Sequence, residues 1–394
     1  PRHQPGRPPA QWVLTAERCA ALTGFARDAG FRLMFTLNAG PSARDARGAW
    51  LPDDARRLVS HSVSRADPVD VWELGNEPNA YPLLHRTWLS PERYGDDLFT
   101  ARRLLDELAP AAKLAGPAAA FWPGLGEGRG FHERALSVGG RAVDVVTWHY
   151  YPQQSFRCPL ATRRARAGEP VGVRHLDEVA HWASAVAASA ERHAPNAVTW
   201  LGETGHAQCG GEPGASNAWS DTLWWLDELG LVARHGHPVV VRQTLTGSDY
   251  GLLDRETLEP NPSYWASVLW RRLMGTHVLA VTRSHPHGPL RVYAHCTRGS
   301  RGGVAAVFLN MHTRDGVRVP LDGAPAGPVE MWRLTADGPT ARTVHLGGTT
   351  LVDHDGELPE LAGTAIPAGL AAWTAPPLSV TWLRWPHAAA SACQ

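Results

Sequence analysis

Val71-Trp72-Glu73-Leu74-Gly75-Asn76-Glu77-Pro78 joins an apolar, Trp-bearing run to a glutamate that meets a turn. Further along the chain, Val198-Thr199-Trp200-Leu201-Gly202-Glu203-Thr204 repeats this arrangement. The apolar runs predict strands buried on both faces, with Glu77 and Glu203 at or near their carboxyl ends. Barrel enzymes place reactive side chains there, because only at that end do several strands converge on one cavity.

Strands and helices alternate around these two stretches. The predicted strands lie near residues 31–38, 69–76, 113–118, 143–150, 197–203 and 238–244. The predicted helices cover 15–29, 53–64, 91–108, 177–193, 220–235 and 263–274. This order indicates an α/β fold whose parallel sheet is covered on both faces or closed into a (β/α)8 TIM barrel. A closed barrel needs eight strands, so the six visible strands form an open sheet or are completed by another segment.

The pattern changes near residue 277. Short strands with Gly and Pro turns follow without helices between them, near 290–295, 304–310, 317–321, 329–334, 341–346 and 378–385. This pattern is typical of a β-sandwich. We therefore expect a catalytic barrel over 1–276, incomplete at its N-terminus, and a β-sandwich domain over 277–394.

The composition limits the expected partners and cofactors. Lys+Arg and Asp+Glu both total 38, so the net charge gives no reason to expect a nucleic acid or an anionic membrane as the main partner. No apolar run reaches the length of about 18 residues that would predict a membrane span. The five cysteines are widely spaced, without a CxxC pair or a cluster with histidine, so we expect neither a metal site nor a cofactor.

Paired carboxyl groups suit glycoside cleavage. In the retaining mechanism they stand about 5–5.5 Å apart, one protonated to expel the leaving oxygen and one ionised to attack the anomeric carbon. A lone glutamate at a strand end is more often part of an ion pair or a helix cap, but two at matching strand ends favour catalysis. We assign Glu77 as the acid/base, Glu203 as the nucleophile and Asn76 as a ligand of a sugar hydroxyl. Glu73 is interpreted as structural.

Several blocks of the chain resemble the heparanase family. They are Trp72 to Asn79, Asp144 to Tyr151, Trp200 to Thr204, Val241-Arg242-Gln243 and, most specifically, Arg291 to Thr297 with the C-terminal Ala392-Cys393. The resemblance implies a (β/α)8 barrel with a β-sandwich and endo-β-glucuronidase activity on heparan sulfate. It also implies that Glu77 is similar to the proton donor and Glu203 to the nucleophile.

The resemblance offers an explanation for the missing strands. In mammalian members a linker is excised, and a small N-terminal fragment supplies the first barrel strands. An N-terminal fragment of the same precursor is therefore expected as a partner, either as a separate chain or as an upstream region. The Pro-rich start, Pro1–Pro9, resembles a linker remnant.

Further site residues follow from the resemblance. Tyr151, or alternatively Tyr150, is similar to the tyrosine that hydrogen-bonds the nucleophile, although a core tyrosine is the other interpretation. Gln243 and Tyr250 are similar to residues that contact the sugar carboxylate or its neighbours. Asn38 ends the first visible strand, where it either lines the cleft or terminates the strand.

The loops at the expected barrel mouth carry more candidates. Gly210 and Gly211 either present backbone N–H groups to the sugar carboxylate or form an ordinary turn. Gln208, with the cysteine that follows it, stands where the mammalian pattern has tyrosine and glycine, which weakens the prediction that the acid group is recognised as in the family. Arg163 and Arg164 either contact sulfate or carboxylate groups or form a solvated loop surface.

The cysteines indicate where the protein works. Cys296 and Cys393 match the disulfide of the family's sandwich. Cys158 and Cys209 follow neighbouring strands, which allows a second disulfide, while Cys19 remains a buried thiol. Two disulfides would indicate an oxidising compartment, so we expect a secreted or periplasmic protein.

The leading interpretation is a retaining endo-β-glucuronidase that acts on heparan sulfate or a related glucuronic-acid polysaccharide. An exo-acting β-glucuronidase differs only in the loops that block or open the cleft. A catalytically silent sulfated-glycan-binding protein is the alternative from another class, and the presence of both glutamates disfavours it.

Overall fold

The computed structural model describes residues 14–65, 69–128, 130–282, 285, 287–321, 323–325, 327–354, 356–367 and 371–394. The stretch Pro1–Pro9, expected to be a linker remnant, lies outside these residues. The chain divides into two compact units, which are described in turn. The first runs up to Phe121 and includes Leu125–His149 and Ser184–Gly202, and the second holds Trp122–Gly124, Tyr150–Ala183 and Glu203–Gln394.

Six strands form one sheet in chain order, β1-β2-β3-β4-β5-β6. They are β1 Met34–Leu37, β2 Val71–Leu74, β3 Lys113–Phe121, β4 Val145–Tyr150, β5 Val198–Thr204 and β6 Val239–Arg242. β1 and β2 pair in parallel with Leu37 opposite Leu74, and β2 and β3 are parallel as well. Each strand therefore neighbours the next one along the chain, which is the order of a (β/α)8 barrel wall.

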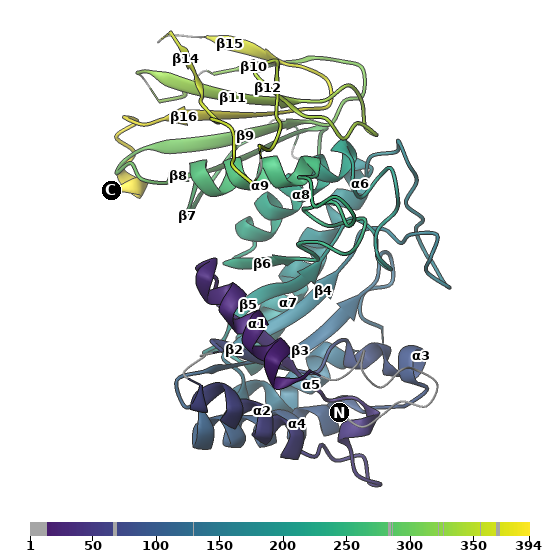
Figure 1. Ribbon diagram of the computed structural model, residues 1–394. Coiled ribbons are helices and arrows are strands. Elements are labelled where there is room, and N and C mark those ends of the chain that lie inside the picture. The colour runs from purple at the N-terminus through teal and green to yellow at the C-terminus, as the bar shows by residue number, and fades with distance from the viewer. Residues whose placement is uncertain are drawn as a thin grey trace. The chain divides into compact units, whose positions relative to one another are not determined.

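The first unit contains the helices α1 Ala16–Asp28, α2 Asp53–Ser64, α3 Tyr81–His85, α4 Pro91–Leu108 and α5 Phe131–Gly139. Two of them begin at a side-chain cap. Thr15 caps α1 by accepting the N–H of Arg18, and Ser90 caps α4 by accepting the N–H of Arg93, both at 3.2 Å. α2, α4 and α5 pack side by side (Figure 1). α4 and α5 come so close that a Cβ on Gly95 would lie 2.6 Å from Cβ of Val138.

The second unit holds an eight-stranded sheet of order β13-β12-β11-β16-β9-β8-β7, with β14 on β11, and a two-stranded sheet of β10 and β15. These strands are β7 Met274–Leu279, β8 Leu290–Thr297, β9 Val304–Asn310, β10 Val317–Pro320, β11 Val329–Thr335, β12 His345–Leu346, β13 Thr349–Thr350, β14 Thr364–Ile366, β15 Ala372–Ala375 and β16 Ser379–Trp385. The predicted fold class, a parallel barrel sheet followed by a β-sandwich, is confirmed.

Two helices of the second unit lie against the sandwich (Figure 1). They are α8 Trp219–Arg234 and α9 Pro262–Leu273, while the short α6 Val173–Leu176 precedes α7 Glu178–His193. A Cβ on Gly230 of α8 would lie 2.2 Å from the ring of Tyr293 in β8, so only glycine allows this contact. Below it, Asp227 accepts hydrogen bonds from Arg291 Nε at 2.8 Å and from the Tyr293 hydroxyl at 2.6 Å.

None of the described helices combines enough residues with enough apolar character to span a membrane.

Candidate active site

Glu77 occupies a tight left-handed turn directly after β2. Gly75 has φ +74°, and a Cβ there would lie 2.9 Å from Cβ of Ala39. Glu77 itself has φ 48° and ψ 53°, the left-handed conformation that few non-glycine residues adopt. Its N–H donates to the carbonyl of Ala118 at 3.0 Å, and Pro78 begins the next helical turn. The turn therefore fixes the direction in which the Glu77 carboxylate points.

The imidazole of His149 lies beside this carboxylate. Its Nδ1 lies 3.3 Å from Glu77 Oε1, and the imidazole is 2% exposed. His149 was not among the residues predicted for the site, although a histidine at the end of a buried strand, two residues before Tyr151, could have indicated it.

The two candidate asparagines, Asn76 and Asn38, have different settings. Asn76 is exposed within the Glu77 turn. Asn38 closes the turn after β1, because its side chain accepts the N–H of Gly40 at 2.9 Å and donates to Ser42 at 3.2 Å. These contacts favour strand termination as the role of Asn38.

In the second unit, Glu203 lies next to Tyr151. The Tyr151 hydroxyl donates to Glu203 Oε1 at 2.7 Å, whereas the side chain of Tyr150 is fully buried. The ring of Tyr250 lies 6.2 Å from that of Tyr151, and burial followed by the charge of Glu203 raises the pKa of Tyr250. Sequence analysis also missed Gly205, where a Cβ would lie 2.8 Å from the Tyr151 ring.

The loop after β5 is held against its neighbours by backbone contacts. Gly210 and Gly211 have φ +88° and +83°, so both need the freedom of glycine. The Gly210 carbonyl accepts the N–H of Asp249 at 2.9 Å, and the N–H of Gly211 donates to the Ala207 carbonyl at 3.1 Å. Gln208 bonds through its backbone to the 153–155 segment, and the N–H of Gln243 donates to the Thr204 carbonyl at 2.7 Å.

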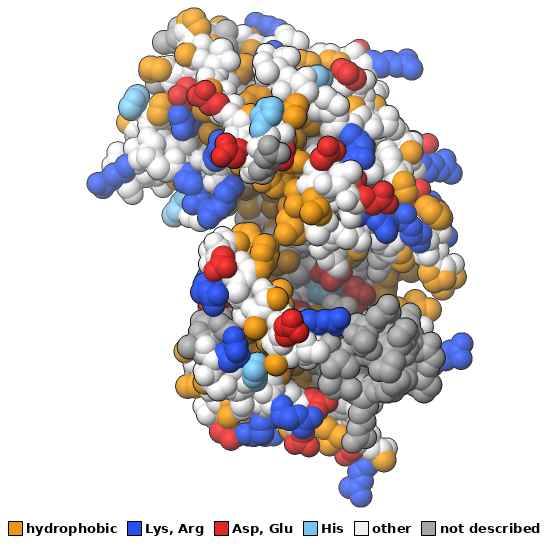
Figure 2. Space-filling model, in the orientation of Figure 1, with side chains coloured by type: hydrophobic (Ala, Val, Ile, Leu, Met, Phe, Trp, Pro, Cys, Tyr) orange, Lys and Arg blue, Asp and Glu red, His pale blue; other side chains and the backbone are white. Residues whose placement is uncertain are grey.

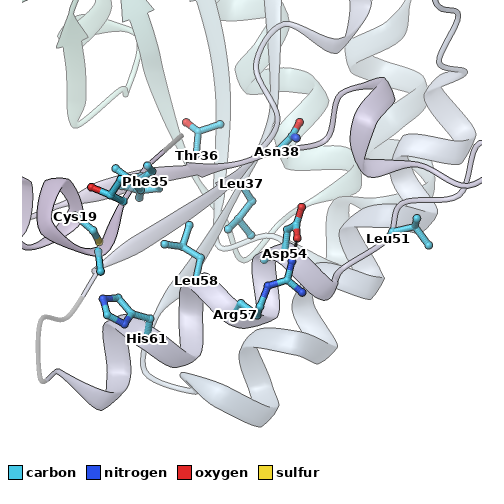
Figure 3. A pocket seen from close by; sticks show the side chains of 14 residues that line it. Cys19, Phe35, Thr36, Leu37, Asn38, Leu51, Asp54, Arg57, Leu58 and His61 are labelled. Carbon is cyan, nitrogen blue, oxygen red and sulfur yellow. Dashed lines mark hydrogen bonds and ion pairs between the residues drawn. The ribbon is translucent and has the colours of Figure 1, made fainter. Parts of the chain in front are cut away.

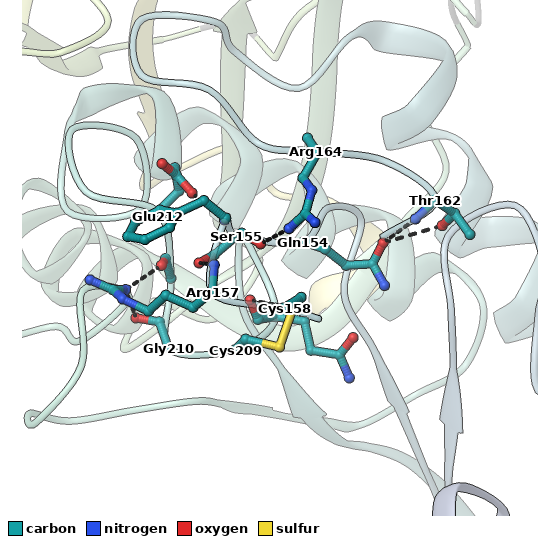
Figure 4. The surroundings of a disulfide bond; sticks show 12 residues. Gln154, Ser155, Arg157, Cys158, Thr162, Arg164, Cys209, Gly210 and Glu212 are labelled. Carbon is teal, nitrogen blue, oxygen red and sulfur yellow. Dashed lines mark hydrogen bonds between the residues drawn. A yellow bond between two sulfur atoms is a disulfide. The ribbon is translucent and has the colours of Figure 1, made fainter. Parts of the chain in front are cut away.

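A disulfide between Cys158 and Cys209 joins this loop to the one after β4 (Figure 4). Beside it, Arg157 donates to the carbonyl of Gly211 at 2.7 Å and pairs with Asp249 at 2.7 Å. Arg157 had not been singled out from the sequence, because its partners lie far away along the chain. The second disulfide, Cys296–Cys393, lies in the sandwich, and Cys19 is a buried free thiol.

Two arginines of the 158–174 loop bind protein atoms outside that loop. Arg163 pairs with Glu178 at 2.8 Å and donates to the Pro152 carbonyl at 3.0 Å. Arg164 donates to the Ser155 carbonyl (Figure 4). Because both guanidinium groups already bind protein atoms, a sulfate contact would have to add to these bonds or replace them.

Strand-end glutamates on a parallel barrel sheet with an attached β-sandwich define the class of barrel glycoside hydrolases. Residues 10–230 match the family model "Glycosyl hydrolase family 79, N-terminal domain", and the chain belongs to this family.

Two curated relatives and one solved structure extend the comparison. The chain is 33% identical over 369 residues to heparanase of Mus musculus, covering 89% of this chain and 65% of that protein. It is 29% identical over 381 residues to inactive heparanase-2 of Homo sapiens, covering 91% and 62%. The chain thus spans less than two thirds of the length of both relatives. An α-L-arabinofuranosidase from Thermotoga maritima shares the fold, with a TM-score of 0.68, 14% identity, and coverage of 93% of this chain and 78% of that one.

Proposed function

We propose that the chain is the catalytic part of a retaining endo-β-glucuronidase that cleaves heparan sulfate or a related glucuronic-acid polysaccharide. The observation that carries the proposal is the 2.7 Å hydrogen bond from Tyr151 to Glu203, in a member of glycosyl hydrolase family 79. The relative from mouse, named heparanase, supports this choice of substrate.

The proposed reaction assigns one role to each glutamate. Because the carboxyl ends of barrel strands meet at one rim, we assign Glu77 and Glu203 to the same sugar. The Glu203 carboxylate attacks the anomeric carbon while Tyr151 holds one of its oxygens, and Glu77 gives its proton to the leaving oxygen. Water, deprotonated by Glu77, then releases the sugar from Glu203. His149, at 3.3 Å from Glu77, orients this carboxyl group and can exchange its proton.

We assign recognition of the sugar carboxylate to Tyr250, Gly210 and Gln243. The N–H of Asp249, the residue before Tyr250, donates to the Gly210 carbonyl at 2.9 Å, which holds Gly210 near Tyr250. The N–H of Gln243 donates to the carbonyl of Thr204, the residue after Glu203, at 2.7 Å. Surface charge adds little to this recognition, since Figure 2 shows Lys and Arg interspersed with Asp and Glu on the face it presents. The proposed binding is therefore local to the reacting sugar and its neighbours.

We also propose that a preceding segment of the same precursor completes the barrel. Among the described strands, β1 pairs only with β2 in its sheet, so one edge of β1 remains open. Beside β1 lies a mainly apolar cavity of about 410 Å³, around which Figure 3 shows Phe35, Leu37 and Leu58. Co-expression with the upstream segment is expected to yield a stable complex and activity, whereas full activity of residues 1–394 alone would contradict this completion.

The decisive experiment replaces each glutamate by glutamine. Both Glu77→Gln and Glu203→Gln should lower the cleavage of heparan sulfate about a thousandfold or more. With p-nitrophenyl glucuronide, whose leaving group needs no proton, the first step should survive in Glu77→Gln but not in Glu203→Gln. Glu191→Gln, an exposed change on α7, is the matched control. Unchanged cleavage by either site variant would overturn the assignment.

Product analysis separates the remaining possibilities. A ladder of fragments and retention of the β-configuration at the new reducing end are expected from a retaining endo-enzyme. Release of glucuronate alone would indicate the exo-acting alternative. Binding of heparan sulfate without any cleavage would indicate a silent binder, a role that the similarity to inactive heparanase-2 makes worth testing.

A further inference from the structure

Glu228 of α8 is a buried carboxyl group directly beneath the strand that carries Glu203. It is 2% exposed and has two polar contacts within the second unit. One oxygen, Oε2, accepts the indole N–H of Trp224 at 2.9 Å. The other, Oε1, lies 2.5 Å from the hydroxyl oxygen of Thr204, the residue that follows Glu203. Glu228 and Trp224 were not singled out from the sequence.

The number of protons available to these contacts indicates whether Glu228 is protonated. The Thr204 hydroxyl has one proton and also lies 2.7 Å from the carbonyl oxygen of Tyr150, which can only accept. If Thr204 donates to Tyr150, the contact with Glu228 forms only when Glu228 itself supplies a proton. Since Oε2 accepts from Trp224, the proton belongs on Oε1, where it points at Thr204.

We propose that Glu228 is a neutral carboxylic acid in the working protein and, through Thr204, a positioning residue that keeps Glu203 in reach of Tyr151. This inference rests on the proposed role of Glu203 as nucleophile. Thr204 directly follows Glu203, and Tyr150 directly precedes Tyr151, so the Thr204–Tyr150 bond ties together the two strand ends that bear the reacting pair. The 2.7 Å contact between Tyr151 and Glu203 depends on that tie.

Loss of the Glu228 proton reverses the direction of the hydrogen bond between Glu228 and Thr204. An ionised carboxylate is a stronger acceptor than a peptide carbonyl, so Thr204 would turn its proton from Tyr150 to Glu228. The side-chain bond from Thr204 to the Tyr150 carbonyl would then be lost, while β4 and β5 remain neighbours in the sheet, and Glu203 would gain freedom relative to Tyr151.

The surroundings of Glu228 favour the neutral form. Burial raises its pKa to about 8, and the nearby charge of Asp227 acts in the same direction. The contacts with Thr204 and Trp224 lower this pKa, and so does Arg242 on β6, whose guanidinium pairs with Asp221 at 2.6 Å and donates to the Tyr250 carbonyl. Asp227 is held by Arg291, while Tyr150, Trp224 and Thr204 complete the neighbourhood of the carboxyl group.

Glutamine reproduces the neutral acid and cannot ionise. In Glu228→Gln, the amide N–H donates to Thr204 and the amide oxygen accepts from Trp224, so kcat on heparan sulfate at pH 6 should stay within about twofold of the wild type. Glu228→Ala should lower kcat about tenfold, and Thr204→Val should do the same at every pH. Above pH 8 the wild type should lose activity in a step that Glu228→Gln lacks, while Glu191→Gln keeps the wild-type profile.

A spectroscopic measurement tests the proton independently of turnover. The infrared difference between the wild type and Glu228→Gln should contain the band of a protonated carboxyl group that disappears near pH 8. Absence of this band at pH 6, or a Glu228→Gln variant as impaired as Glu228→Ala, would overturn the inference. If the band is present while Glu203→Gln remains active, the proposed nucleophile is wrong and the positioning role falls with it, although the protonation state stands.

Discussion

The hydroxyl of Tyr151 donates a 2.7 Å hydrogen bond to Oε1 of Glu203, and the two residues come from the ends of the neighbouring strands β4 and β5. The Tyr250 ring lies beside this pair, and the missing Cβ of Gly205 makes room for both tyrosines. The hydrogen bond thus fixes one oxygen of the Glu203 carboxylate relative to Tyr151.

Replacement of Tyr151 by phenylalanine should lower kcat about ten- to a hundredfold with little change in KM. Hydrogen bonds to charged groups contribute about 1.5–3 kcal/mol, and here the bond orients a nucleophile rather than the substrate. Steady-state kinetics on heparan sulfate would measure this. Tyr264→Phe, on α9, removes the same atom elsewhere and should leave both constants unchanged. A purely raised KM in Tyr151→Phe would instead assign Tyr151 to substrate binding.

The two disulfides should have separable effects. On the chain-entropy model, opening Cys158–Cys209, with a separation of 51 residues, destabilises the protein by at most about 4 kcal/mol, and Cys296–Cys393, with 97, by about 4–5 kcal/mol. Replacing the first pair by serine should also raise KM, because Gly210 lies beside Cys209. The second replacement should lower stability alone. Thermal unfolding and kinetics on both double variants check this, and an equal rise of KM in both would contradict it.

Arg291→Met should be strongly destabilising. Arg291 and Asp227 are both 0% exposed in their side chains, so the change leaves a buried carboxylate without its cation, at a cost of about 3–5 kcal/mol. Urea unfolding measures the difference in free energy. Arg56→Met breaks the solvent-exposed pair with Glu107 and should leave stability nearly unchanged. Equal effects of the two substitutions would show that Asp227 is compensated in another way.

Acid should destabilise the protein through two buried histidines. Burial lowers the pKa of His132 to about 4, and burial with the charge of Arg242 lowers that of His206 to about 3. Between pH 6.5 and these values the unfolded chain binds protons that the folded chain does not, so the free energy of unfolding falls as pH falls, by about 1.4 kcal/mol per pH unit and histidine.

Urea unfolding at pH 7, 6 and 5 measures this slope. His206→Gln removes one titrating group and should flatten the slope, whereas the exposed His277→Gln should not. An unchanged slope in His206→Gln would show that His206 is protonated in the folded state.

Local signals explain which elements could be predicted. The helices Asp53–Ser64 and Pro91–Leu108 have the predicted bounds, because proline and a serine cap mark their starts. The expected strand 341–346 shrinks to His345–Leu346, since strands of two residues have no detectable alternation. α5 was not predicted, because its flanking glycines indicate a loop although they allow its close contact with α4.

The site residues also divide into those that a local sequence pattern indicates and those that it does not. Glu77 and Glu203 could be singled out because each ends an apolar run, a pattern contained in a few consecutive residues. His149, Arg157 and Glu228 matter through partners far away in the chain, and no local pattern reports such contacts. For Asn38 the sequence leaves two roles open, lining the cleft or ending a strand, and the hydrogen bond that its side chain accepts from the Gly40 N–H favours the second.

The contact between Gly230 and Tyr293 bears on how this protein could be divided or recombined. Any side chain at position 230 would push β8 away. Removal of the sandwich would expose Asp227 and the surface of α8 at Gly230 that the Tyr293 ring covers. A chain cut near residue 276 should therefore yield two pieces that are insoluble by themselves. Exchange of sandwiches between relatives should succeed only when α8 is exchanged together with its sandwich.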